Sequence, residues 1–267
     1  MQLLTPLLPD PAAPLARANP VAKIGAAALL MLACFLSTDA VTPALVLLVV
    51  LVAIPFSGLS AGTLLRRGWP LLFAAIGVGL ANALLPEETS GRLLFGFGPF
   101  QLSTGSLAVG GALAVRLLGI AFAGVLALAT VEPTDLADSL AQQLHLSPRF
   151  AIGALAAVRL LPLLADEWQT ISLARRARGV DAGRSPLAAA RLFAGKMLGL
   201  LVGAIRRGTR LALAMEARGF GARSCRTWAR PQRMRGADWA LLGAALLVAV
   251  GATLVSLALG EWRFFLS

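Results

Sequence analysis

The chain has 267 residues, of which 58% are hydrophobic and 14% charged, and its formal net charge is +11. This composition excludes an ordinary soluble domain and indicates an integral membrane protein. The only cysteines, Cys34 and Cys225, are too few for a disulfide framework or a metal cluster, so redox chemistry is not indicated.

Five apolar stretches are predicted to cross a hydrocarbon core about 30 Å thick. They cover residues 21–36, 41–57, 69–85, 107–130 and 239–259. Because ten-residue alternating patterns are absent from the sequence, the spans are expected to be helices rather than barrel strands. The sequence therefore predicts an all-α integral membrane protein with about five transmembrane helices, in addition to the long helices described below.

Charge placement predicts the orientation, because short loops rich in Lys and Arg stay in the cytoplasm. Arg17 and Lys23 lie at the start of the first span, and an Arg-Arg pair at 66–67 separates the second from the third. The alternate connections at 37–40 and 86–92 are mainly acidic. We therefore expect a multi-pass protein of the cell (inner) membrane with a cytoplasmic N-terminus.

A strongly basic segment at 131–235 holds 17 of the 24 Lys and Arg residues. The chain is accordingly divided into transmembrane helices at 1–130, a cytoplasmic-side region at 131–235 and a last transmembrane helix at 236–267. The basic segment opens with an amphipathic pattern at 133–145, whose apolar face carries Leu136, Ala137, Leu140, Ala141 and Leu144, and whose polar face includes Ser139.

Two long helices are predicted next. Ser147-Pro148 and Ser185-Pro186 each have the pattern of an N-cap followed by proline at the first helical position. Each pattern runs to an Arg-Gly pair, where glycine can adopt the left-handed conformation that closes a helix and the next residue, Val180 or Phe220, can pack back. Helices of this length reach roughly 45 to 50 Å, and we expect bends at Pro162 and near Gly203 or Gly208.

The two helix ends repeat the sequence Ala-Arg-Gly, at 177–179 and 217–219. Small neighbours leave the guanidinium of Arg178 or Arg218 free to enter a partner's groove, where its fork of donors suits carboxylates and carbonyls. The alternative is that each arginine only complements the dipole of its own helix.

These residues resemble the transmembrane T component of energy-coupling factor transporters, the family that includes cobalt, biotin and shared vitamin importers. The resemblance covers roughly residues 19–223. Besides the two Ala-Arg-Gly motifs, it includes Thr130-x-x-Pro133-x-Asp135-Leu136, Arg159-x-x-Pro162 followed by Glu167, and an acid-Pro-x-x-Lys element that here reads Asn19-Pro20-Val21-Ala22-Lys23. The acid of that last element is missing.

The resemblance implies a coupling subunit that is not an enzyme and has no catalytic, cofactor or metal site. It would dock two ABC-type ATPases through Ala177, Arg178, Gly179, Ala217, Arg218 and Gly219. It would also hold a small substrate-binding membrane subunit and transmit ATP-driven motion for vitamin or transition-metal uptake. Arg159, Pro162, Glu167 and Glu216 are expected to support this site, with Glu216 either paired to an arginine or solvated.

Two other functions remain open from the residues alone. A conventional ABC importer permease also presents a coupling helix, although usually one per chain. A membrane enzyme acting on lipids lacks support because the sequence has no paired-aspartate motif, and Asp166-Glu167 is a lone acidic pair. Gly195-Lys196 is only a two-residue echo of a phosphate loop, so the chain is not expected to be its own ATPase.

Four further features each have two interpretations. Arg116, inside the fourth span, is either functional or reaches the outer interface from a helix that begins near Ala112. The basic stretch around Trp228 is expected to meet membrane lipids rather than nucleic acid. Metal binding by His145 is not expected. Small-residue faces around Gly77 to Ala81 and Gly110 to Ala123 would serve docking or internal packing.

Overall fold

The structure is a computed structural model that describes residues 13–59, 61–85, 92–97, 100–180, 183, 185–220, 228 and 230–260. The predicted connection at 86–91, Asp181, Arg184, and Cys225 with its neighbours Arg223 and Arg226 lie outside these residues. The chain divides into two compact units, with boundaries after residues 139 and 231.

Helices dominate the structure, and the predicted all-α membrane fold is confirmed. In chain order the elements are α1 (Pro20–Leu36), α2 (Val41–Ala53), a 3-10 turn η2 (Pro55–Ser57), α3 (Ala61–Leu84), β1 (Leu93–Phe97), β2 (Phe100–Ser103), α4 (Thr104–Ala129), α5 (Pro133–Gln143), α6 (Pro148–Ala177), α7 (Pro186–Ala217) and α8 (Gly236–Ala258).

Four helices in the described part of the chain are long and apolar enough to cross a membrane, namely α4, α6, α7 and α8. The predicted spans at 21–36, 41–57 and 69–85 form shorter apolar helices, in α1, α2 and part of α3. Length and composition therefore do not separate α6 and α7 from the spanning helices, and their place on the cytoplasmic side stays a prediction.

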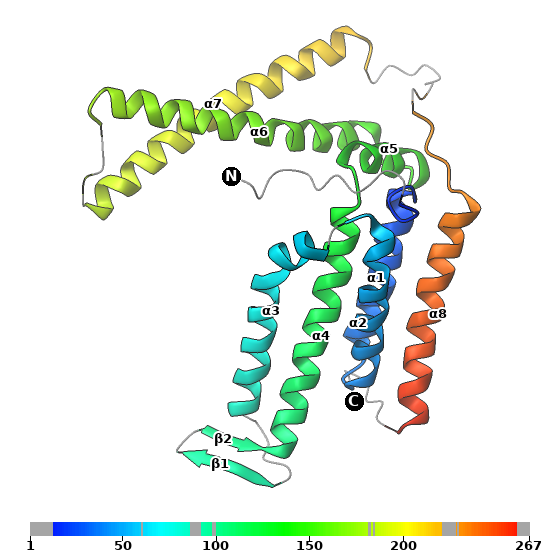
Figure 1. Ribbon diagram of the computed structural model, residues 1–267. Coiled ribbons are helices and arrows are strands. Elements are labelled where there is room, and N and C mark those ends of the chain that lie inside the picture. Colours follow the sequence, from blue (N-terminus) through cyan, green and yellow to red (C-terminus); the bar gives the residue numbers. More distant parts are fainter. Residues whose placement is uncertain are drawn as a thin grey trace. The chain divides into compact units, whose positions relative to one another are not determined.

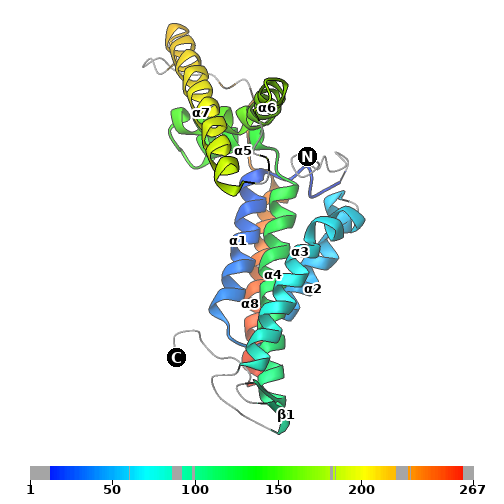
Figure 2. The same cartoon turned by 90° about the vertical axis from the view of Figure 1, so that its left-hand side faces the viewer.

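Helices α1 to α4 and α8 form a bundle in which they run side by side (Figures 1 and 2). The main cluster of buried apolar side chains lies where α1, α2 and α4 meet. The side chains there are Cys34, Val46, Val50, Phe122, Ala123 and Leu126. Small residues in this core, such as Cys34 and Ala123, allow the helix axes to come close together.

The closest approach in the bundle is between α3 and α4. A Cβ added to Gly79 would lie 2.7 Å from the carbonyl oxygen of Gly110 and 2.8 Å from the Cβ of Ala114. By contrast, a Cβ added to Gly77 or Gly111 would meet nothing within 4 Å among the described residues. Of the two interpretations of these small-residue faces, internal packing therefore holds for Gly79 and Gly110.

A two-stranded hairpin, β1 and β2, connects α3 to α4 and was not predicted. The strands are antiparallel, with Phe95 opposite Leu102 and Phe97 opposite Phe100, and the register shifts between Leu93 and Phe95. Its strands have five and four residues, so they lack the alternating pattern of about ten residues that a membrane-spanning strand would show. A short hairpin depends instead on its turn residues and on pairing between the strands.

The helix of the fourth span, predicted at 107–130, begins at Thr104, so the alternative in which it starts near Ala112 is wrong. Arg116 is consequently well inside α4, where it is half-buried. One of its terminal nitrogens donates to the carbonyl oxygen of Ser37, the C-cap of α1. A guanidinium at this point satisfies an end carbonyl and complements the negative end of the helix dipole.

The amphipathic helix is confirmed as α5, with two differences from the prediction. Ser139, expected on the polar face, is fully buried, and Leu144, expected on the apolar face, lies beyond the helix end and is 55% exposed. His145 follows in the left-handed conformation, with φ of 53°. The described residues include no cluster of three or more potential metal ligands.

We predict that Gly110→Ala lowers the stability of the purified protein by about 1–3 kcal/mol, because the new methyl group would press α4 against the α3 backbone. The matched control is Gly111→Ala, at the next residue of the same helix, which should be neutral. Thermal unfolding in detergent measures both. Equal melting temperatures for the two variants would contradict the α3–α4 contact.

Candidate functional site

Polar side chains gather at the end of the bundle where α1 and α8 begin and α4 ends. Lys23, only 5% exposed, donates from Nζ to the carbonyl oxygens of Ala16, at 2.9 Å, and Thr130, at 2.8 Å. Thr130 is the C-cap of α4, so the ammonium lies at the negative end of that helix. The structure thus brings together two motifs of the resemblance, those at 19–23 and 130–136.

An acid from α8, Asp238, contacts Asn19, the residue that stands in place of the acid of the acid-Pro-x-x-Lys element. Asn19 caps α1 by accepting a hydrogen bond from the N–H of Val21 at 2.9 Å, and its own N–H donates to Oδ1 of Asp238 at 2.7 Å. The other oxygen of Asp238 accepts from the N–H of Arg235 at 2.7 Å. Asp238 is 3% exposed, and both of its oxygens are therefore satisfied by backbone donors.

Helices α6 and α7 form the second unit, in which they cross each other (Figure 1). Both begin at the predicted prolines and end at the predicted Arg-Gly pairs. The Ser185 side chain accepts the expected capping bond, from the N–H of Ala188 at 3.4 Å, whereas the Ser147 side chain makes no capping bond. Helix α6 continues through Pro162, and α7 continues through Gly203 and Gly208.

Three glycines of α7, spaced by four residues at 195, 199 and 203, lie along the crossing. Nη1 of Arg175 donates to the carbonyl oxygen of Leu192 at 3.0 Å, and its guanidinium would be 3.2 Å from a Cβ placed on Gly195. Ile171 lies against Gly199, and the carboxylate of Glu167 lies 3.3 Å from a Cβ placed on Gly203. The missing side chains provide the space that these longer side chains fill.

Aromatic packing occupies the same crossing. Trp168 of α6 and Phe193 of α7 form an edge contact with ring centroids 5.4 Å apart, and Nζ of Lys196 lies 5.2 Å from the centroid of the Trp168 ring. A cation over an indole face is favourable. Lys196, which belongs to the Gly195-Lys196 pair that resembles part of a phosphate loop, therefore contacts α6 from α7.

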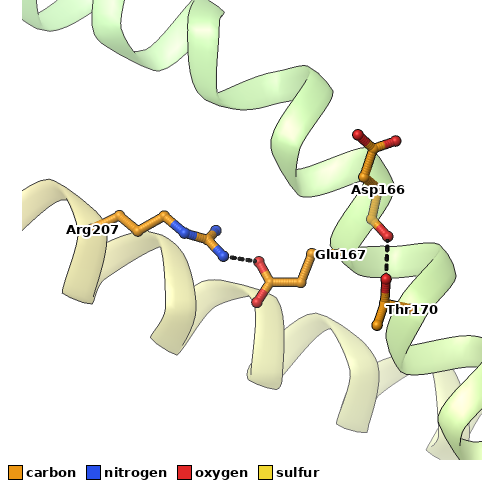
Figure 3. Close-up of polar contacts among 4 residues, drawn as sticks. All are labelled: Asp166, Glu167, Thr170 and Arg207. Atoms are coloured by element: carbon orange, nitrogen blue, oxygen red, sulfur yellow. Dashed lines mark hydrogen bonds and ion pairs between the residues drawn. The ribbon is translucent and has the colours of Figure 1, made fainter.

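Glu167 forms an ion pair with Arg207 of α7, with 2.6 Å between Oε2 and Nη2 (Figure 3). The figure also shows that the neighbouring carboxylate of Asp166 points away from Arg207. The two adjacent acids therefore face different surroundings and do not act as a pair. Glu167 was expected to be a supporting residue, but its partner was not predicted, because nothing in the sequence distinguishes Arg207 from the adjacent Arg206.

Both Ala-Arg-Gly motifs close their helices in the same way. Arg178 and Arg218 are the C-caps, and the glycines that follow have φ of 72° and 74°. After α6, the N–H of Gly179 donates to Arg176 O at 2.9 Å and that of Val180 to Arg175 O at 3.0 Å. This double hydrogen bond is the Schellman motif, whose left-handed residue is normally glycine.

Helix α7 ends with the same pair of bonds. The N–H of Gly219 donates to Glu216 O and that of Phe220 to Met215 O, both at 2.9 Å. Phe220 is half-buried, whereas Val180 stays 44% exposed, so hydrogen bonding rather than apolar packing is the feature common to the two ends. The prediction that the octads mark two helix ends is confirmed.

The two arginines are exposed. They cap the C-terminal ends of α6 and α7, and these two helix ends point in opposite directions from the crossing (Figure 1). Neither guanidinium has a hydrogen bond or an ion pair with another described residue. Arg178 follows Arg175, which contacts Leu192 near the start of α7, whereas Arg218 lies at the far end of that helix. At 1.5 Å per residue, the 26 residues from 192 to 218 correspond to about 40 Å.

Two of the other expected residues lie apart from these ends, and one lies beside Arg218. Arg159 and Pro162 are exposed on α6, on the N-terminal side of the crossing. Glu216 is exposed in the last turn of α7 and has no ion pair with the other residues that the structure describes. Of the supporting residues, Glu167 takes part in the contacts between the two helices.

Comparison with known proteins shows the family to which the chain belongs. The family model described as "Cobalt transport protein" (CbiQ) matches residues 11–228. The energy-coupling factor transporter transmembrane protein EcfT of Exiguobacterium sibiricum is 31% identical over 251 residues, covering 90% of this chain and 93% of the relative. The protein of the same name from Heliobacterium modesticaldum is 33% identical over 239 residues, covering 85% and 88%.

These matches show that the chain is a membrane-embedded component of a transporter. More specifically, the chain belongs to the EcfT/CbiQ family, the transmembrane components of energy-coupling factor transporters.

We predict that Asn19→Asp destabilises the protein by about 2 kcal/mol, because it adds a carboxylate beside the buried Asp238. Asp238→Asn should also destabilise, since an amide offers one acceptor oxygen to two N–H donors. The double variant, which carries both substitutions, should lose less stability than the two single variants lose together. Thermal unfolding of the wild type, both single variants and the double variant measures this difference. Strict additivity would contradict the contact.

We further predict that Glu167→Arg weakens the pairing of α6 with α7 and that adding Arg207→Glu restores it. The effect on stability should be small, about 0.5 kcal/mol, because both side chains are partly exposed. A disulfide introduced between cysteines replacing Ile171 and Gly199 reports the pairing directly. Arg206→Glu is the matched control, and rescue of the Glu167 variant by that change would contradict the assigned ion pair.

Proposed function

We propose that this T component docks two ABC-type ATPases, one through Arg178 and one through Arg218. It passes their ATP-driven movement to a small substrate-binding membrane subunit that takes up a vitamin or a transition-metal ion. The observation that carries the proposal is the repeated helix end, in which one exposed arginine occupies the same C-cap position of two long helices.

The chemistry of these ends suits docking. Each Schellman closure already satisfies the end carbonyls through backbone N–H groups, so the arginine is not needed for that purpose. In α6, Arg175 and Arg176 in the last turn already complement the helix dipole. The dipole alone therefore does not explain why a third arginine, Arg178, follows them. A guanidinium held on a rigid helix end costs little further ordering on binding.

The separation of the arginines favours two docking sites over one. About 40 Å along α7 is too far for both side chains to enter a single small groove. A conventional permease with one coupling site per chain accounts less well for the duplication. Membership in a family of transporter components also leaves the lipid-processing alternative without support.

The crossing of α6 and α7 supports a role in transmission. The contacts of Arg175 with Leu192, Trp168 with Phe193 and Glu167 with Arg207 tie the helices together at one place. A displacement of either arginine end would therefore move both helices. Exposed apolar residues recur along α7 at Leu198, Leu201 and Ile205, and they provide a face for a membrane partner.

We also propose that the arginine ends and the N-terminus lie on the cytoplasmic side of the cell membrane. The excess of basic residues at 131–235 supports this orientation.

Replacing both Arg178 and Arg218 with Glu should abolish copurification of the ATPases and uptake by the intact complex. A docking arginine is worth about 2 kcal/mol or more, so each change should weaken binding about 30-fold or more. The matched control is Arg176→Glu with Arg210→Glu, which makes the same charge change at exposed positions of the same two helices. Persistence of copurification and uptake in the first variant would refute the proposal.

Single substitutions test the stoichiometry in the same assay. Wild-type complexes should contain two ATPase subunits for each T subunit by native mass spectrometry. Each single variant should give complexes with one. One ATPase in the wild type would instead favour the permease interpretation.

A further inference from the structure

A cavity of about 140 Å³ lies among α1, α2, α4 and α8, within the bundle unit. Its walls are almost entirely hydrocarbon, and many of them are alanines, including Ala27, Ala53, Ala127 and Ala245. The cavity is partly open rather than sealed. Small side chains on four separate helices thus leave a space that the bundle does not fill.

Water is a poor occupant of this space. A buried water needs about three hydrogen-bond partners, and an engineered apolar cavity of about 150 Å³ stays dry and binds benzene instead. An empty cavity would forfeit the dispersion contacts of its lining. Because the bundle belongs to a membrane protein, the medium available at its surface is lipid hydrocarbon.

One end of the cavity is polar. Lys23 lines it together with Thr130, and the ammonium uses two of its three N–H groups on backbone carbonyls. The third N–H has no hydrogen-bond partner among the described residues. Lys23 is more than nine-tenths buried, so this donor has little access to bulk water. A fitting ligand therefore carries an acceptor oxygen at the head of a hydrocarbon chain.

Charge at this end favours an anionic head group. Asp135 and Asp238 carry negative charges that act on Lys23, and both oxygens of Asp238 accept hydrogen bonds from backbone N–H groups. Lys23, Arg233 and Arg235 nevertheless outnumber these two acids. The exposed side chains of Arg233 and Arg235 immediately precede α8, whose first residues pair with the start of α1. Basic residues near the membrane surface attract anionic lipids by about 1 kcal/mol each.

We propose that this partly open cavity binds a segment of one acyl chain of an anionic phospholipid, with a head-group oxygen directed to the ammonium of Lys23. The lipid then completes the packing of four helices that leave the space open. The site is separate from the arginine ends, and its occupant is a structural ligand rather than the transported cargo.

The test uses the full-length chain, purified in detergent with extensive washing and examined by native mass spectrometry. Wild-type protein should retain about one phospholipid. Ala245→Phe, which places an aromatic ring in the cavity, should reduce the retained lipid at least tenfold. The matched control, Leu247→Phe, changes a residue of the same helix that is 74% exposed, and it should retain lipid as the wild type does.

A thermal assay with added lipid provides the second readout. Phosphatidylglycerol should raise the melting temperature of the wild type by about 5 °C at saturating concentration and leave Ala245→Phe unchanged. Ala27→Leu, a smaller filling change on α1, serves if Ala245→Phe does not give folded protein. Phosphatidylcholine should have a much weaker effect on the wild type.

Three results would overturn the proposal. The first is wild-type protein that retains no lipid after washing. The second is equal retention by the wild type and a folded cavity-filling variant. The third is an equal thermal shift with phosphatidylcholine and phosphatidylglycerol, because the head group would then have no part in binding.

Discussion

The last carbonyl groups of a helix need donors, and in a membrane protein water cannot supply them everywhere. Two ways of closing a helix end stand out in the described residues. After α1 and α4, buried or half-buried cations do so, with Arg116 on Ser37 and Lys23 on Thr130. In the crossed pair, the backbone N–H groups that follow Arg178 and Arg218 do so.

The difference decides which cations remain available to other molecules. Arg116 and Lys23 direct hydrogen bonds to helix ends inside the bundle, so neither is available to a protein partner at the surface. Glycine in the left-handed conformation closes α6 and α7 without a side chain, and each arginine stays at the surface. The arginine side chain is therefore not needed to satisfy the end carbonyls, and it can bind a partner instead.

Local patterns were sufficient to predict the limits of the two long helices. Proline at the first position and Arg-Gly at the end act within a few residues of each boundary, so their effect can be read without the tertiary structure. The partners across the fold could not be predicted in this way. Many arginines could in principle have paired with Glu167, and only the crossing of α6 with α7 selects Arg207.

Asn19 shows why a motif match and a physical site can differ. By sequence position, the missing acid suggests that a charge has been lost beside Lys23. In the structure, Asp238 arrives from α8 and accepts the N–H of Asn19, which places a carboxylate at the start of α1 from a point 219 residues away. Electrostatic energy depends on where a charge lies in space and on how far it is shielded from water, not on the helix that supplies it. A carboxylate is therefore present near Lys23 although Asn19 is not an acid, and the start of α1 is tied to the last helix of the bundle.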